Sequence, residues 1–149
     1  MDPALREWIV SILEGAQDMT IATVREDGYP QATTVSYVSD GLTIYFACGA
    51  ASQKARNITR NDKVSLTVNL PYSNWDEIRG LSAGGTAERI TAPQEMEEIG
   101  RLMFKKFPQI SQYATDGMME GVALIRVTPK VFSILDYGKG FGHTESVEV

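Results

Sequence analysis

The fold is decided by residues 19–58, which read MTIATVREDGYPQATTVSYVSDGLTIYFACGAASQKARNI. Three segments of this stretch, 19–24, 31–38 and 42–47, are rich in Thr, Val, Ile and aromatic residues, the side chains that favour β-strands. Asp27-Gly28 and Asp40-Gly41 separate them, and such dipeptides are typical of tight hairpin turns. The stretch therefore predicts two consecutive antiparallel hairpins.

The rest of the chain adds further strands to these hairpins. Residues 63–70 (KVSLTVNL) alternate between polar and apolar side chains, which predicts a strand with one buried face. Residues 78–90 fit a long strand that Gly84-Gly85 bends or bulges. Residues 122–127 and 131–135 are predicted to be two closing strands on either side of Pro129. About seven strands in sequential hairpins predict a mainly β fold, a closed or nearly closed antiparallel barrel with Greek-key-like order.

Three helices accompany the strands. Apolar residues recur at helical spacing over residues 3–14, and Ser52 is a good N-cap for a second helix. A third helix is predicted over residues 92–106, where Thr91 and Gln94 have the spacing of a capping box. No repeat or linker interrupts the chain, so residues 1–149 are expected to form a single domain.

Composition limits the classes of function. The chain has 149 residues, 43% of them hydrophobic, and a net charge of −5, which argues against nucleic-acid or anionic-lipid binding. The sequence has no basic segment followed by an apolar run and no long uncharged apolar window, so neither a signal peptide nor a membrane span is expected. The single cysteine, Cys48, suits a reducing compartment, and the expected location is the cytoplasm.

The chain offers little catalytic chemistry of its own. His143 is the single histidine, and it lies in what the sequence suggests is a loose C-terminal tail, a poor position for orienting a base. One cysteine and one distant histidine give no metal-ligand spacing, so no metal site is expected. If the protein is an enzyme, the reactive atoms should belong to a cofactor.

A small basic segment indicates what that cofactor carries. Residues 52–61 (SQKARNITRN) contain Lys54, Arg56 and Arg60 and no acidic residue. The free N–H groups of a helix that begins at Ser52, together with the Lys54 ammonium, would form a site for a phosphate. The same residues could instead be a solvated helix face, and the residues alone leave both interpretations open.

The stretches MTIATVREDGYPQATTVSYV, DGLTIYFACGAASQKARNI and RNDKVSLTVN resemble the pyridoxamine-phosphate-oxidase-like split-barrel flavoproteins. The resemblance implies an FMN-binding split barrel that works as a homodimer and acts as an oxidoreductase on a small molecule. It places the flavin ring and ribityl chain along the strand that contains residues 33–36, and the FMN phosphate at residues 52–54. The implied cofactor-binding residues, of which the last two could come from the partner subunit, are Thr33, Thr34, Val35, Ser36, Ala47, Cys48, Ser52, Gln53, Lys54, Asn57, Trp75 and Arg79.

The chain also departs from that family. True pyridoxamine-phosphate oxidases have an R-x-V-L-L-K pattern in the flavin strand, where this chain has QATTVS, and their C-terminal Trp and Arg-Leu-x-Pro elements are absent from residues 136–149. Vitamin B6 oxidation is therefore not expected, and the substrate or electron donor stays open. The alternatives are a non-catalytic flavin module for electron transfer or sensing, a split barrel for the deazaflavin F420 or for haem, and a flavin-free binding barrel. For haem, the single histidine leaves His143 as the one imidazole ligand.

Overall fold

The computed structural model describes residues 1–113 and 118–149. Seven strands lie in these residues: β1 (Asp18–Val24), β2 (Pro30–Asp40), β3 (Thr43–Gly49), β4 (Lys63–Asn69), β5 (Arg79–Arg89), β6 (Val122–Asp136) and β7 (Thr144–Glu148). The longer helices are α1 (Pro3–Gly15), α2 (Gln53–Arg60) and α3 (Pro93–Lys106), followed by the short α4 (Ile110–Tyr113). Single 3₁₀ turns are η1 (Trp75–Glu77), η2 (Met118–Gly121) and η3 (Tyr137–Lys139).

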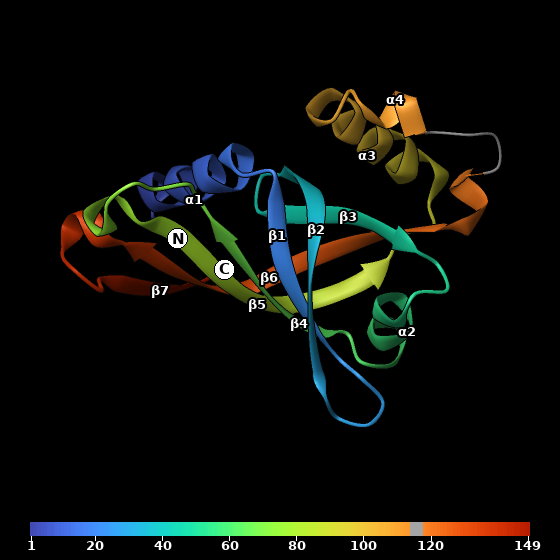
Figure 1. Ribbon diagram of the computed structural model, residues 1–149, viewed down its shortest axis with the longest axis horizontal. Coiled ribbons are helices and arrows are strands. Elements are labelled where there is room, and N and C mark those ends of the chain that lie inside the picture. The colour runs from blue at the N-terminus through green and yellow to red at the C-terminus, as the bar shows by residue number, and fades with distance from the viewer. Residues whose placement is uncertain (114–117) are drawn as a thin grey trace.

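The strands close into a barrel. Their order is β3-β2-β1-β4-β5-β6-β7, every pairing is antiparallel, and β3 also pairs with β6. The first six strands therefore form a closed ring, and β7 extends the sheet beyond β6 (Figure 1). The connection that contains α2 crosses from β3 to β4, so that β4 pairs with β1. This crossover gives the Greek-key-like order that the sequence predicted.

One core fills the barrel. On β4 the inward residues Val64, Leu66 and Val68 are buried and their neighbours are exposed, the alternation expected of a strand with one face in a core. The helix α1 lies across one end of the barrel and buries Ile9 and Leu13 against this core. The prediction of an amphipathic helix at the start of the chain is confirmed.

A second, smaller core lies outside the barrel, beneath α3. Its buried members are Val38 on β2, Tyr45 on β3, Ile90 just after β5, Ile99 and Phe107 on or beside α3, and Leu124 on β6. Val38 points to the same face of β2 as Thr34 and Ser36, yet it is buried while they are exposed. The helix therefore covers one end of this sheet face and leaves the other end open.

The two closing strands predicted around Pro129 are a single strand, β6, and that prediction was wrong. Proline is tolerated there because Pro129 pairs with Gly85, where the register of β5 shifts by a bulge. A Cβ on Gly85 would lie 2.3 Å from the carbonyl oxygen of Thr128, so only glycine permits this close approach. The predicted bulge at Gly84-Gly85 is thus confirmed, and it explains why the strand continues past Pro129.

Two other expectations need correction. The predicted capping box at Thr91 and Gln94 is absent, because Ala92 is the N-cap of α3 and no side chain caps it. The C-terminal segment is also not a loose tail, since residues 144–148 pair with β6 as β7. Among the described residues, no helix is both long enough and apolar enough to cross a bilayer.

Candidate functional site

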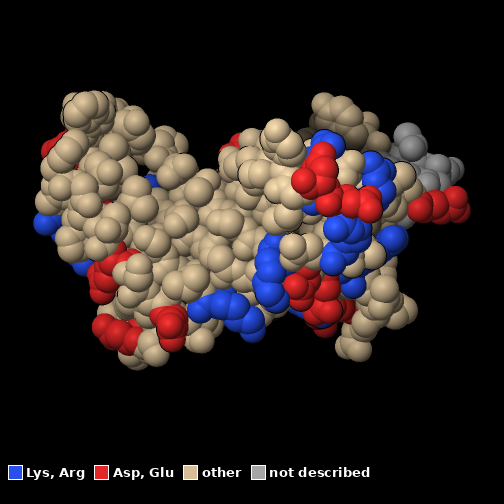
Figure 2. Space-filling model, turned by 90° about the horizontal axis from the view of Figure 1, so that it is seen from below, with Lys and Arg blue, Asp and Glu red and all other residues tan. Residues whose placement is uncertain are grey.

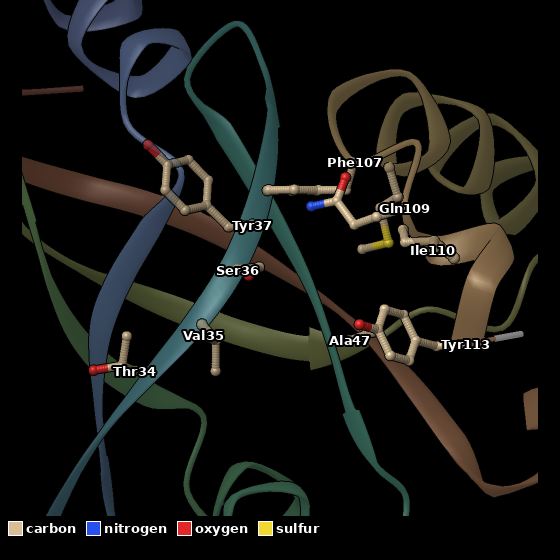
Figure 3. Close-up of a pocket in the computed structure, with 10 residues that line it drawn as sticks. Thr34, Val35, Ser36, Tyr37, Ala47, Phe107, Gln109, Ile110 and Tyr113 are labelled. Carbon is tan, nitrogen blue, oxygen red and sulfur yellow. The ribbon is translucent and has the colours of Figure 1, made fainter.

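A pocket of about 450 Å³ lies between the sheet and the last part of the α3–α4 segment (Figure 3). One wall is formed by residues 34–37 of β2 and by Ala47 of β3. The other wall is formed by Met103, Phe107, Gln109, Ile110 and Tyr113. We call this space the sheet–helix pocket.

The pocket lies where β2 and β3 separate. These strands pair only between Tyr37 and Asp40 on β2 and between Thr43 and Phe46 on β3. Before Tyr37, β2 pairs only with β1. After Phe46, β3 pairs only with β6. On the open part of β2, the exposed residues Thr34 and Ser36 alternate with buried Val35. The divergence exposes hydroxyl side chains and strand backbone beside the pocket.

Lys106 fixes the helical wall in place. Its Nζ donates a 2.6 Å hydrogen bond to the carbonyl of Ala16, just after α1, and lies 4.1 Å from the centre of the Tyr37 ring. The Tyr37 hydroxyl in turn donates to the carbonyl of Leu13 at 2.5 Å. Burial lowers the pKa of Lys106 and raises the pKa of Tyr37. The end of α3 is therefore fastened both to α1 and to β2.

The start of α2 lies at the other side of the β2–β3 divergence. Ser52 caps the helix: its hydroxyl accepts from the N–H of Ala55 at 3.2 Å and donates to the carbonyl of Gly49 at 2.6 Å. The Nζ of Lys54 lies 5.9 Å from the centre of the Phe46 ring, and within the described residues it makes no hydrogen bond or ion pair. On β2, the hydroxyl oxygen of Thr33 is the one buried side-chain oxygen in the described residues that lacks a hydrogen-bond partner.

A buried amide network holds α2 against the barrel. Asn57 is 1% exposed, and its Nδ2 donates to Thr23 Oγ1 at 3.0 Å and to Gln31 Oε1 at 2.9 Å. Gln53 completes the network by donating from Nε2 to Asn57 Oδ1 at 2.7 Å. Because these groups satisfy one another, the network fixes where the N-terminus of α2 points.

The basic side chains of residues 52–61 and their neighbours differ in whether a partner in the structure engages them. Arg56 is engaged by the carbonyl of Ala51 at 2.5 Å and by Gln53 Oε1 at 2.8 Å. Lys63 pairs with Asp62 at 3.1 Å, and on the neighbouring β1–β2 turn Arg25 pairs with Asp27, whose pKa it lowers. Figure 2 shows the molecule from below. Basic and acidic side chains intermix toward one end of this view, beside a broad uncharged area. Lys54 and Arg60 are the cations of this segment that make no hydrogen bond or ion pair within the described residues, and of the two only Lys54 lies at the N-terminus of α2.

The structure brings together some of the predicted site residues and separates others. Thr34, Val35, Ser36 and Ala47 line the sheet–helix pocket, and Ser52, Gln53 and Lys54 follow at the start of α2. Cys48, next to Ala47, packs against the barrel core, as alternation along β3 requires. The residues on the helical wall were missed. Phe107, Ile110 and Tyr113 recur every three residues in FPQISQY, a pattern that could have marked a second apolar face beyond α3.

Trp75 and Arg79 lie elsewhere. Trp75 begins η1 and Arg79 is the first residue of β5. Both follow the end of β4 that is farther from α2 (Figure 1). Trp75 is 66% exposed, and its ring centre is 5.7 Å from that of Phe141, which is 78% exposed and packs edge-on against Tyr137. Within one chain, this exposed aromatic cluster does not contribute to the sheet–helix pocket.

His143 is also remote from the pocket. It lines a separate cavity of about 360 Å³ together with Trp8 and Asp136, and its N–H donates to the carbonyl of Gly140 at 3.0 Å. Within residues 1–113 and 118–149, no three His, Cys, Asp or Glu side chains gather as metal ligands would. The sheet–helix pocket and the α2 N-terminus are therefore the candidate site.

A six-stranded antiparallel barrel whose β2 and β3 diverge beside a helix N-terminus defines a split-barrel protein. A family model described as pyridoxamine 5'-phosphate oxidase matches residues 5–136, and the chain belongs to this family. A pyridoxine/pyridoxamine 5'-phosphate oxidase of Vibrio cholerae is 31% identical over 112 residues. The match covers 74% of this chain and 48% of the oxidase, so the chain spans about half the length of that relative.

Solved structures share the fold. A haem-binding protein from Mycobacterium smegmatis superposes with a TM-score of 0.82 at 18% identity, covering 99% of this chain and 59% of that protein. A conserved hypothetical protein from Mycobacterium tuberculosis has a TM-score of 0.76 at 27% identity, covering 97% of this chain and 91% of that one. Proteins with this fold therefore include one described by its haem binding.

Proposed function

We propose that this protein binds FMN and works as an FMN-dependent oxidoreductase on a small molecule. The observation that supports this most is the position of Lys54, a cation with no partner in the described residues at the first turn of a helix capped by Ser52. A helix N-terminus with a neighbouring ammonium is a general site for phosphate. The family match supports the same cofactor.

The residues present fit such a cofactor. The exposed hydroxyls of Thr34 and Ser36 on β2 border the pocket, whereas the buried, unpartnered hydroxyl of Thr33 lies outside its lining. In the proposed complex, Ser52, Gln53 and Lys54 hold the phosphate, while residues 33–36 with Ala47 lie along the ring and the ribityl chain. When bound, FMN supplies hydride and electron transfer. The protein's part is to orient the ring and to shield it from water.

The proposed substrate is not pyridoxamine 5'-phosphate. In the part of the chain that the structure describes, no cation lines the sheet–helix pocket to hold a second phosphate. The test is anaerobic addition of NADH or NADPH to the FMN-loaded protein, followed by the flavin absorbance. Bleaching by a nicotinamide is expected. Bleaching by dithionite alone would favour a non-catalytic flavin module, and turnover of pyridoxamine 5'-phosphate at about 1 per second or faster would contradict the substrate assignment.

We further propose that the active form is a homodimer in which Trp75 and Arg79 reach the site of the partner subunit. The exposed cluster of Trp75, Phe141 and Tyr137 is a large apolar surface for a single chain to leave in water. Its position away from the chain's own pocket supports a role across an interface.

Haem is the second candidate, favoured by the structural similarity to the Mycobacterium smegmatis protein. The sheet–helix pocket contains no histidine, and its possible axial ligands are Met103 and Tyr113. Titration with hemin distinguishes the two cofactors, because haem ligation produces an intense Soret band whereas FMN binding changes the flavin spectrum. A Soret band at one haem per chain, without FMN binding, would replace the flavin proposal.

A further inference from the structure

The described residues that line the sheet–helix pocket include no charged side chain. The pocket's sheet wall offers the hydroxyls of Thr34 and Ser36, and its helical wall is mostly apolar. Two polar groups interrupt the helical wall: the Gln109 amide and the Tyr113 hydroxyl, which point toward the strands (Figure 3). Within the described residues, the Gln109 side chain makes no hydrogen bond, so its amide can serve a ligand.

Lys105 and Lys106 lie between the lining residues Met103 and Phe107, but neither side chain lines the pocket. Lys105 is exposed. Lys106 precedes Phe107, but its Nζ donates to the carbonyl of Ala16 and lies over the Tyr37 ring. Arg126, on β6 below α3, is bound by Glu88 at 2.6 Å and by Glu95 at 2.5 Å. Lys54 lies on the α2 side, where the proposed function assigns it to the FMN phosphate. Among the described residues, no cation lines the pocket to meet an anionic group on a second ligand.

We propose, on the basis of the FMN site proposed above, that the helical wall binds an uncharged ring compound bearing a polar oxygen, and that Gln109 determines this specificity. Phe107 and Ile110 supply apolar surface for the ring, and the Gln109 amide can donate to its oxygen. A phosphorylated ligand would leave its charge without a counter-ion in a largely apolar pocket, which strongly disfavours binding.

The test uses 1-naphthol and 1-naphthyl phosphate, which share one ring system and differ by the phosphate. FMN binding is first established by fluorescence quenching, and each probe is then measured by equilibrium dialysis against the FMN-loaded protein. The naphthol should bind at least about tenfold more tightly than its phosphate. Gln109→Arg should reduce or reverse this preference, because it places a cation in the wall. The matched control is Gln112→Arg, an exposed position of α4 outside the pocket lining, which should leave the preference unchanged.

Each outcome decides one claim. Normal FMN quenching with equal affinity for the two probes, or an equal effect of both arginine variants, would overturn this inference and leave the flavin site intact. Loss of the preference in Gln109→Arg with full FMN binding would support it. Failure of the wild-type protein to quench FMN would overturn the proposed function, and this inference with it.

Discussion

At the scale of single residues, Lys54 is the most informative position for the cofactor. A charge-assisted hydrogen bond to phosphate contributes roughly 1.5–3 kcal/mol, so Lys54→Ala should weaken FMN binding about 10- to 100-fold. Riboflavin, which lacks the phosphate, should bind both proteins equally. Fluorescence titration with the two flavins measures both effects, and equal losses for FMN and riboflavin would mean that Lys54 acts through the fold.

The control for Lys54 must be a basic residue of α2 that holds nothing in place. Arg56 is unsuitable, because it bonds to Ala51 and Gln53 and so supports the loop before the helix. Arg60 is exposed at the other end of α2 and makes no hydrogen bond or ion pair within the described residues. Arg60→Ala should therefore leave FMN affinity within about twofold of the wild type.

Tyr37 should give the protein a characteristic alkaline titration. Its ring is fully buried, and burial raises its pKa above that of an ordinary tyrosine. The folded state then keeps the phenol proton where the unfolded state loses it. The stability from this group is thus complete below about pH 10 and declines as the pH rises further. Absorbance at alkaline pH should show the buried Tyr37 and Tyr45, whose pKa values burial raises, ionising later than an ordinary tyrosine. Tyr37→Phe should reduce the amplitude of that late phase.

At the scale of elements, the pairing of β5 with β6 past Pro129 depends on Gly85. A Cβ there would lie 2.3 Å from the carbonyl oxygen of Thr128, so Gly85→Ala must shift the backbone and should destabilise the protein by about 1–3 kcal/mol. Gly100 is the matched control, since it is exposed in the middle of α3 and a Cβ there meets nothing within 4 Å. Gly100→Ala should stabilise by about 0.5–1 kcal/mol. Urea unfolding of the two variants measures both, and a Gly85→Ala protein as stable as the wild type would contradict the bulge argument.

The same elements show what the sequence could and could not predict. The β-favouring residues of 19–24 and 31–38 predicted two of the strands. Alternation along 63–70 predicted another, because one face of that strand must enter the barrel core. The continuity of β6 could not be predicted, because Pro129 ends a strand locally and only the bulge at Gly85, from another strand, permits it. The segment 144–148 has little apolar pattern, and its pairing with β6 is a tertiary effect. The helical wall of the pocket was missed for a similar reason, because α3 and α4 meet β2 only in the folded chain.

At the scale of the whole molecule, the proposed dimer predicts complementation between two defective chains. Lys54→Ala damages a chain's own site, whereas Trp75→Ala should damage the site of its partner. Neither variant alone should bind FMN tightly. Unfolding and remixing the two should restore tight binding at up to about a quarter of all sites, because half of the dimers at statistical mixing would be hybrids with one intact site each.

In that mixture, the fraction of FMN fluorescence that is quenched at a low FMN concentration measures the restored sites. No restoration, with each variant still dimeric by sedimentation, would place Trp75 in the chain's own site or in no site. A wild-type protein that sediments as a monomer near 16.4 kDa while binding FMN tightly would overturn the shared-site proposal altogether.

The most direct test of the account is a fluorescence titration of FMN with the purified wild-type protein. We expect quenching that saturates at one FMN per chain, with riboflavin binding more weakly because it cannot use Ser52 and Lys54. No quenching by the flavin, together with a Soret band on addition of hemin at one haem per chain, would contradict the account.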